Sequence, residues 1–328
     1  MKAIVYNQYG PPEVLQLIEM EKPIPKDDQV LVKVYAASVN AAEWHLLTAD
    51  IFLVRLMTGG LLKPKNTRLG SDVAGRVEAV GGNVTQFRPG DEVFGDIASS
   101  SSGSFAEYVA VSEMALALKP ANLSFEQAAA APLAGITALQ GLRDQGHIQS
   151  GQKVLINGAS GGVGTFAVQI AKVFGAEVTA VTSTGKLDQA LSLGADHVID
   201  YTKDDFTQNG QQYDLILAVN GYHPLSAYQR ALAPQGIYVM AGGTPAQIFQ
   251  ALLLGPLKSK SGGKKITSLT AHANQKDLVI LKELLEGGKI VPAIDRTYPL
   301  SETAEALRYL GAGHARGKIV ITVEHKDQ

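Results

Sequence analysis

The segment KVLINGASGGVGTFAVQIAKVFGAEVTAV, residues 153–181, is the most informative part of this chain for its fold. An apolar strand at Val154–Asn157 runs into a glycine-rich turn. An amphipathic helix at Thr165–Phe174 follows, and then a second apolar strand at Val178–Val181. This order is that of a βαβ unit, whose two strands lie parallel in one sheet. The segment therefore predicts an α/β architecture.

Glycines at positions 158, 161, 162 and 164 make the turn of this unit a predicted dinucleotide site. Glycine permits a tight turn and a close approach of a pyrophosphate to the backbone, and the first N–H groups of the helix can donate to it. The spacing is not a literal GxGxxG, and the turn could also serve only to pack helix on strand. The complete βαβ unit favours the cofactor site, with contacts expected from Ser160, Gly161, Gly162, Val163 and Gly164.

Strand and helix patterns alternate around this unit, as a doubly wound parallel sheet requires. A helix is predicted at Gly135–Gln145, and further strands at Val198–Ile199, Leu215–Val219, Ile237–Ala241 and Ile266–Thr270. We therefore expect a Rossmann domain over residues 123–273.

The residues before this domain have a β-rich pattern, with short runs separated by Gly, Pro and Asp. The runs are Ala3–Tyr6, Val30–Ala36, Ala74–Val80 and Phe105–Val111. Near the end of the chain, Lys276–Glu286 predicts a helix and Ile319–Val323 predicts a strand. With 328 residues the chain exceeds the usual size of a single core, so two domains are expected.

The composition excludes several classes of site and partner. Apolar residues make up 45% of the chain and charged residues 18%, as in ordinary globular proteins. The absence of cysteine rules out disulfides and thiolate ligands. A net charge of -2 and a pI near 6.4 do not favour nucleic acid or an anionic membrane. No apolar run reaches the length of a membrane span, so we expect a cytoplasmic protein.

The residues after the second strand of the βαβ unit indicate which nucleotide is bound. NAD-binding units commonly place an acid there for the ribose 2′-hydroxyl. This chain instead continues with Thr182, Ser183, Thr184, Gly185 and Lys186. Hydroxyls and a lysine suit a 2′-phosphate, which favours NADPH over NADH. The alternative is that Lys186 is only a solvated residue at the start of the next helix.

Several motifs, taken in their order and spacing, resemble the medium-chain dehydrogenase/reductase superfamily, specifically its quinone oxidoreductase branch, which contains ζ-crystallin. They are SVNAAEW at 38–44, LGSDVAGRVEAVGGNV at 69–84, FRPGDEVFG at 87–95, GSFAEYVAV at 103–111, AAAPLAGITAL at 129–139, the glycine turn, LGADHVIDY at 193–201 and ARGKIVI at 315–321. The resemblance covers nearly the whole chain. It implies a GroES-like domain over residues 1–122 and 274–328, with the active site in the interdomain cleft.

The resemblance also implies roles for individual residues. Lys186 and Tyr201 would contact the adenosine 2′-phosphate, and Gly242 and Gly243 would pass near the nicotinamide. Further cofactor contacts are expected from Thr137, Ser183, Thr184 and Asn220. Arg316 and Lys318 would reach the phosphates or the nicotinamide ribose, unless they are only surface charges beside the last strand.

Zinc-dependent members of this superfamily carry a cysteine about where this chain has Asn40, and a His-Glu pair where it has Ser71 and Asp72. Catalytic zinc requires three suitable N, S or carboxylate ligands, and this set does not supply them. The seven histidines show no HExxH or similar spacing. No metal is expected.

Without a metal, the natural reaction is hydride transfer to an acceptor activated by conjugation, such as a quinone or an α,β-unsaturated carbonyl. One alternative is a 2-enoyl thioester reductase, for which Lys258, Lys260, Lys264 and Lys265 would form a basic rim. Another is a cofactor-binding protein with little turnover. The partner expected is a small conjugated molecule.

Asn40 and His45 are the candidate catalytic residues. Asn40 would orient the nicotinamide or the substrate, although Asn40 and Glu43 also fit a helix capping box. His45 stands where related reductases often have a tyrosine, and it could donate a proton, or it could be uninvolved. Trp44 would wall the pocket or lie half-buried in the core.

Three irregular segments remain without an assigned role: Ile51–Lys65, Ala98–Ser104 and Ala246–Lys265. The apolar run Ile248–Leu254 fits a pocket lid or a homodimer contact, and also a membrane surface.

Overall fold

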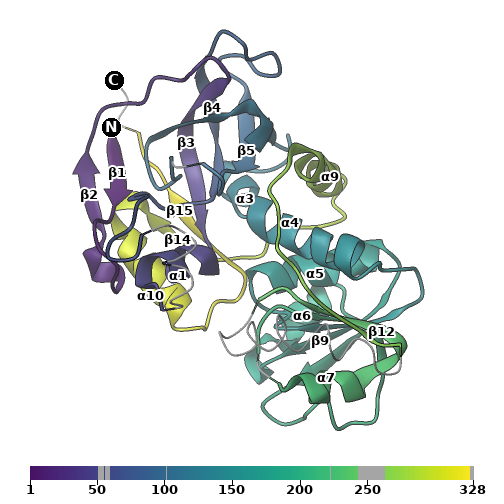
Figure 1. Ribbon diagram of the computed structural model, residues 1–328. Helices are drawn as coiled ribbons and strands as arrows, with labels where there is room; N and C mark the ends of the chain where they lie inside the picture. The colour runs from purple at the N-terminus through teal and green to yellow at the C-terminus, as the bar shows by residue number, and fades with distance from the viewer. Residues whose placement is uncertain (51–54, 56–59, 101, 222, 243–262, 326–328) are drawn as a thin grey trace. The chain divides into compact units, whose positions relative to one another are not determined.

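The computed structural model describes residues 1–50, 55, 60–100, 102–221, 223–242 and 263–325 (Figure 1). Internal contacts divide the chain into two compact units. The first comprises Met1–Leu133, Ala273–Gly288 and Pro292–Gln328, and the second comprises Ala134–His272 and Lys289–Val291. Within the described ranges, no helix is long and apolar enough to cross a membrane.

The second unit contains a six-stranded parallel sheet in the order β10-β9-β8-β11-β12-β13. The strands are β8 Lys153–Asn157, β9 Glu177–Thr182, β10 His197–Asp200, β11 Tyr213–Ala218, β12 Leu232–Met240 and β13 Lys265–Ser268. From β8, the next two strands, β9 and β10, are added toward one edge of the sheet. The chain then crosses back, and β11, β12 and β13 are added on the other side of β8. This is the strand order of a Rossmann sheet, and the predicted fold class is confirmed.

Helices cover the sheet of the second unit. They include α4 Pro132–Gln140, which begins in the first unit, and α5 Gly162–Val173, α6 Leu187–Ser192 and α7 Leu225–Ala231. Figure 1 shows β9 and β12 between α5 on one side and α7 on the other. Because all six strands are parallel, the segments that follow them emerge at one edge of the sheet.

The first unit is built on a seven-stranded, mostly antiparallel sheet in the order β14-β15-β3-β4-β5-β7, with β6 also paired to β3. The strands are β3 Gln29–Val39, β4 Asp72–Val80, β5 Glu92–Asp96, β6 Tyr108–Ser112, β7 Leu116–Leu118, β14 Ile294–Pro299 and β15 Lys318–Thr322. A separate hairpin joins β1 Lys2–Val5 to β2 Gln16–Glu19. The predicted GroES-like β-rich architecture is confirmed. The described helices of this unit include α1 Ala41–Thr48, α3 Phe125–Ala129, α9 Gln275–Glu286 and α10 Thr303–Gly311.

Strand β3 brings together three distant parts of the sequence. Its eleven residues pair with β4 on one side and with β15 and β6 along the other. In these registers Ser38 lies opposite Asp72, and Val39 lies opposite Ile319. The end of β3, the start of β4 and the start of β15 therefore meet at one end of the sheet.

The structure differs from the predicted elements at several boundaries. Strand β4 begins at Asp72 rather than Ala74, because Asp72 already pairs with Ser38 of β3 and with Asp96 of β5. Helix α4 begins at Pro132 rather than Gly135 and gives way to a π-helical turn at Gly141–Gln145. The sequence patterns gave no bounds for β2, β5, β7, β14, α3, α7 and α10.

Candidate functional site

Asn40 joins the end of β3 to the start of α1. It is the N-cap of that helix, and its backbone N–H donates to Glu43 Oε2 at 2.7 Å, with Glu43 at position N3. The predicted capping arrangement is therefore present. It anchors the Asn40 backbone where the sheet gives way to the helix.

The Asn40 side chain lies within a buried polar cluster of the first unit. Its oxygen Oδ1 accepts a hydrogen bond from Lys318 Nζ. Its nitrogen Nδ2 donates to Asp72 Oδ2 at 3.0 Å and, more weakly, to the Ser38 carbonyl at 3.4 Å. These contacts fix which end of the amide faces the lysine, since only the oxygen can accept from an amine.

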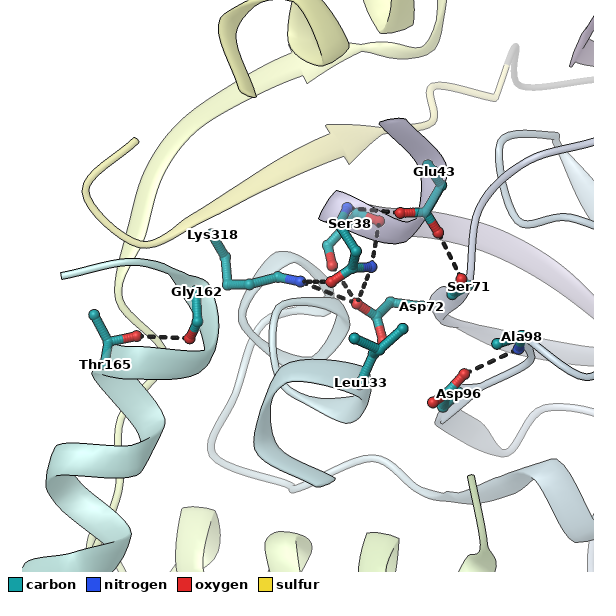
Figure 2. A network of polar contacts seen from close by, with 11 residues as sticks. Ser38, Glu43, Ser71, Asp72, Asp96, Ala98, Leu133, Gly162, Thr165 and Lys318 are labelled. Atoms are coloured by element: carbon teal, nitrogen blue, oxygen red, sulfur yellow. Dashed lines mark hydrogen bonds and ion pairs between the residues drawn. The ribbon is translucent and has the colours of Figure 1, made fainter. Parts of the chain in front are cut away.

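Asp72 is the centre of this cluster and is fully buried. Its Oδ2 accepts from Ser38 Oγ and lies 3.2 Å from Lys318 Nζ, and its Oδ1 accepts from the Leu133 backbone N–H at 2.7 Å. Figure 2 shows Lys318, Ser38 and Leu133 approaching the Asp72 carboxylate. A buried ion pair persists when its charges are paired and hydrogen-bonded, as they are here. We call Asn40, Asp72 and Lys318 the lysine network.

Two further carboxyl groups lie beside the lysine network. Glu43 is buried, and its Oε1 accepts from Ser71 Oγ at 2.5 Å (Figure 2). Asp96 faces Asp72 across the β4–β5 ladder and accepts from the Ala98 backbone N–H at 2.9 Å. Burial, with a contribution from the negative charge of Asp72, raises the pKa of each carboxyl to about 7. Both groups therefore exchange protons near neutral pH.

The residues at the expected zinc-ligand positions do not fit a zinc ion. Asn40 and Asp72 are engaged with the Lys318 amine, and the Ser71 hydroxyl is hydrogen-bonded to Glu43. None of these positions carries the cysteine or histidine that catalytic zinc prefers. Among the described residues, no group of three or more His, Cys, Asp or Glu side chains could hold a metal ion. The positive charge at this place belongs to the lysine.

The other predicted residues of the first unit differ in their contacts and burial. His45, on α1, contacts Asp50 through Nδ1, at 2.9 Å from Oδ1 and 3.2 Å from Oδ2. Arg316 is exposed, and its backbone N–H donates to Asp295. Lys318 is only 3% exposed, so it is not a surface charge. Trp44 is half-buried and lies against Gly311 of α10.

In the second unit, the glycine turn joins β8 to α5 and has no room for a side chain at two of its glycines. A side chain at Gly158 or Gly164 would collide with the neighbouring backbone, because a Cβ would lie 2.8 Å from Asn220 N or 2.1 Å from Gly158 O. A Cβ at Gly161 would meet only Gly158 O, at 3.7 Å, so the outer side of the turn is open. Gly161 is the N-cap of α5 and gives no side-chain cap, which leaves the first N–H groups of the helix for a ligand.

The remaining predicted cofactor residues of this unit follow successive strands at the same edge of the sheet. Ser183, Thr184 and Lys186 follow β9, Tyr201 follows β10, Asn220 follows β11 and Gly242 follows β12. Ser160 and Val163 belong to the glycine turn, and Thr137 lies within α4. Gly243 and the run Ile248–Leu254 lie outside the described residues. The Thr182 hydroxyl at the end of β9 is buried and has no protein partner within the described part of the chain, a polar atom suited to a bound nucleotide.

The sequence did not indicate the roles of the acidic residues in either unit. Asp72 is the first residue of β4, a strand that also carries Arg76 and Glu78, so its position alone gave no signal of burial. Glu43 was identified only as a capping residue. Asp200, at the end of β10, was not considered at all.

Two family descriptions match separate parts of the chain. "Alcohol dehydrogenase GroES-like domain" matches residues 26–121, and "Zinc-binding dehydrogenase" matches residues 193–321. The chain is 40% identical to 2-methylene-furan-3-one reductase of Solanum lycopersicum, over 98% of this chain and 79% of that protein. It is 34% identical, with the same coverage, to the chloroplastic NADPH-dependent alkenal/one oxidoreductase of Arabidopsis thaliana.

Solved structures of oxidoreductases also match the chain over nearly its whole length. The quinone oxidoreductase from Coxiella burnetii matches with a TM-score of 0.86 and 32% identity, over 99% of both chains. The CurK enoyl reductase matches with a TM-score of 0.85 and 25% identity, over 98% of this chain and 99% of that one.

A Rossmann sheet combined with a GroES-like unit, together with these similarities, defines an oxidoreductase of the medium-chain dehydrogenase/reductase superfamily, which uses a pyridine nucleotide. Within that superfamily, the chain belongs to the zinc-free quinone oxidoreductase branch. The resemblance inferred from the sequence motifs is thereby confirmed.

Proposed function

We propose that this chain is a zinc-independent reductase that transfers a hydride from NADPH to a conjugated acceptor, either a quinone or an α,β-unsaturated carbonyl compound. The observation that carries the proposal is the lysine network, in which Lys318 holds Asn40 and Asp72 at the positions where metal-dependent relatives bind zinc. The names of similar proteins, an alkenal/one oxidoreductase and a quinone oxidoreductase, support the acceptor class.

A conjugated acceptor suits a site that has no Lewis acid. Such an acceptor spreads the incoming negative charge onto its own oxygen, so the protein mainly orients it and excludes water. When bound, NADPH supplies the hydride, and one proton completes the reduction. We propose His45 as the group that delivers this proton to the acceptor oxygen, which gives a hydroquinone from a quinone and, from an enone, an enol that tautomerises to the saturated carbonyl compound.

Lys318 has a further donor for the bound molecules. An ammonium group carries three N–H donors, and Asn40 and Asp72 accept two of them. We propose that the third donates to the nicotinamide ribose, as the sequence predicted, and that Asn40 orients the nicotinamide from the same cluster.

The preference for NADPH rests on the residues that follow β9 and β10. The last residue of β9 is Thr182, so this strand does not end in the acid that would hold a ribose 2′-hydroxyl. Lys186 and Tyr201 come from the two neighbouring turns and would bind a 2′-phosphate. Lys186→Ala should raise the KM for NADPH much more than the KM for NADH. Equal small losses for both cofactors would refute the assignment.

The acceptor class is tested by following NADPH oxidation with a panel of quinones, 2-alkenals, enones and saturated aldehydes, each with and without a chelator. We expect turnover with the conjugated compounds and no effect of the chelator. Turnover only with saturated aldehydes, or its loss with chelator, would overturn the proposal. If no acceptor supports NADPH oxidation, the protein binds a cofactor without significant turnover.

A 2-enoyl thioester is the second candidate acceptor, because the CurK enoyl reductase shares the fold at 25% identity. The basic rim expected for a carrier stays a prediction. Lys264 donates to the Gln229 carbonyl within the unit, Lys265 belongs to β13, and Lys258 and Lys260 lie outside the described residues. A 2-enoyl thioester added to the panel compares the two candidates directly.

A further inference from the structure

A buried carboxylate ties together the two turns that carry the proposed 2′-phosphate contacts. Asp200 is the last residue of β10, pairs with Thr182 in the sheet register, and is only 7% exposed. Its Oδ2 accepts a hydrogen bond from Thr184 Oγ1, in the turn after β9. Its Oδ1 accepts from Thr202 Oγ1 at 2.7 Å and from the Thr202 backbone N–H at 3.0 Å, in the turn after β10.

The two threonine hydroxyls are fully used by this contact. Each hydroxyl has one proton, and both protons are directed at Asp200, while the two Oγ1 atoms lie 3.2 Å apart. The Thr184 hydroxyl therefore has only lone pairs to offer to a phosphate, which also presents lone pairs. The cofactor contact expected of Thr184 stays a prediction: its hydroxyl holds the turn, and the donors to a 2′-phosphate would come from the Thr184 backbone or from neighbouring residues.

Possible donors lie in both of the turns that Asp200 connects. Ser183 and Lys186 flank Thr184 in the first turn, and Tyr201 lies between Asp200 and Thr202 in the second. The Tyr201 backbone N–H also donates to the Thr182 carbonyl at 3.0 Å. Asp200 thus fixes the spacing between the segment that carries Lys186 and the segment that carries Tyr201.

The charge of Asp200 has an effect of the opposite sign. Hydrogen bonds from Thr184 and then from Thr202 lower the pKa of its carboxyl to about 2, so the group is ionised at neutral pH. The Lys203 amine lies 3.6 Å from Oδ2 but is well exposed, so it offsets little of this charge. A carboxylate near a phosphate is repulsive, but the oxygens of this one are engaged by three hydrogen bonds from Thr184 and Thr202.

We infer that Asp200 is a positioning residue for NADPH recognition, which holds the Thr184–Lys186 turn against the Tyr201–Thr202 turn so that both can contact the 2′-phosphate. This inference rests on the proposed use of NADPH. It predicts that removing the Asp200 carboxylate weakens binding of a nucleotide that carries a 2′-phosphate. Simple charge repulsion between the carboxylate and the phosphate predicts the opposite.

The test uses two small probes, 2′,5′-ADP and 5′-AMP, titrated calorimetrically into the full-length protein and its variants. Asp200→Asn should weaken 2′,5′-ADP binding about tenfold and leave 5′-AMP binding within about twofold. Thr184→Val keeps the carboxylate but removes one hydrogen bond to it, and should shift binding in the same direction. Asp204→Asn removes the same charge from an exposed position nearby and serves as the matched control.

The outcomes distinguish the proposed use of NADPH from the positioning role of Asp200. If wild-type protein binds 2′,5′-ADP no more tightly than 5′-AMP, the NADPH assignment fails and the inference falls with it. If wild type prefers 2′,5′-ADP but Asp200→Asn binds it equally or more tightly, repulsion outweighs positioning and only the inference fails. Equal weakening for both probes would also overturn the inference, because it would indicate a general structural role. Thr184→Val decides the matter if Asp200→Asn does not fold.

Discussion

Lys318 and Asn40 lie 278 residues apart in the chain, and a hydrogen bond joins the amine of one to the amide oxygen of the other. The bond closes a cluster to which β3, β4 and β15 each contribute a residue or a flanking residue. Asp72 pairs with the same amine, so the lysine engages two of the positions that the family resemblance identifies with zinc ligands. The lysine is therefore expected to matter for stability as well as for the reaction.

Lys318→Met should destabilise the protein by about 3–5 kcal/mol, because it leaves the fully buried Asp72 carboxylate without its counter-charge. Urea unfolding measures this change in free energy. Lys22→Met is the matched control, since Lys22 pairs with Glu78 at the surface, and it should cost about 0–1 kcal/mol.

Adding Asp72→Asn to Lys318→Met should recover part of the lost stability, since it removes the uncompensated charge. A double-mutant cycle measures the coupling between the two residues. If the two single effects simply add, the buried pair is not the source of the stability.

Stability should fall as the pH rises toward neutrality, because the pKa of Glu43 is raised from 4.5 to about 7 in the folded protein. The folded state binds the Glu43 proton more tightly than the unfolded chain does. This contribution is fully present below pH 4.5 and is lost as the pH rises through about 7. The total change is on the order of 3 kcal/mol.

Glu43→Gln mimics the protonated acid and should flatten the curve of unfolding free energy against pH between pH 4.5 and 7. Asp96, whose pKa is also raised to about 7, should still contribute in this variant. The remaining slope should have the same sign as that of wild type but be smaller. Parallel curves for Glu43→Gln and wild type would contradict the prediction.

Glycine substitutions should separate folding from cofactor binding at the turn after β8. Gly164→Ala places a Cβ 2.1 Å from Gly158 O and should destabilise the protein by about 1–3 kcal/mol through overcrowding. Gly161→Ala meets only Gly158 O, at 3.7 Å, and should leave the melting temperature nearly unchanged. It should nevertheless weaken NADPH binding, because the added methyl group occupies the side that a pyrophosphate would approach.

Gly82→Ala is the control for this pair, since its Cβ would meet no atom within 4 Å. The measurements are thermal unfolding and a fluorescence titration with NADPH. Unchanged NADPH affinity in a well-folded Gly161→Ala variant would show that the pyrophosphate does not lie on this turn.

The sequence predicted the Rossmann unit well because its determinants are local. Residues 153–181 contain a complete strand, turn, helix and strand, and each boundary shifted by at most three residues in the structure. The β-rich unit was harder, because short strands such as β5 and β7 acquire their identity from pairing with distant partners.

The candidate site was also hard to predict, because its contacts join residues that are distant in the sequence. Asn40 and Lys318 were identified from motifs, but nothing local indicates that their side chains meet, since only the pairing of β15 with β3 brings them together. Asp72 was considered as a failed zinc ligand and not as the partner of a lysine. Asp200 escaped notice because its role depends on two threonines, one of which lies 16 residues away.

His45 and Asp50 form the last testable pair, at the carboxyl end of α1. The contact of Nδ1 with the Asp50 carboxylate, at 2.9 Å, keeps a proton on Nδ1, so delivery of a proton from Nε2 requires the doubly protonated ring, whose charge the carboxylate would balance. If His45 delivers the proton that completes the reduction, His45→Ala should lower kcat by about 10²-fold or more with enones and quinones. Asp50→Asn should lower it less, because it disturbs only the orientation and the charge balance of the ring. KM for NADPH should stay close to the wild-type value in both variants. Full turnover of His45→Ala with both acceptor classes would mean that the proton comes from solvent and that the pair only stabilises the end of the helix.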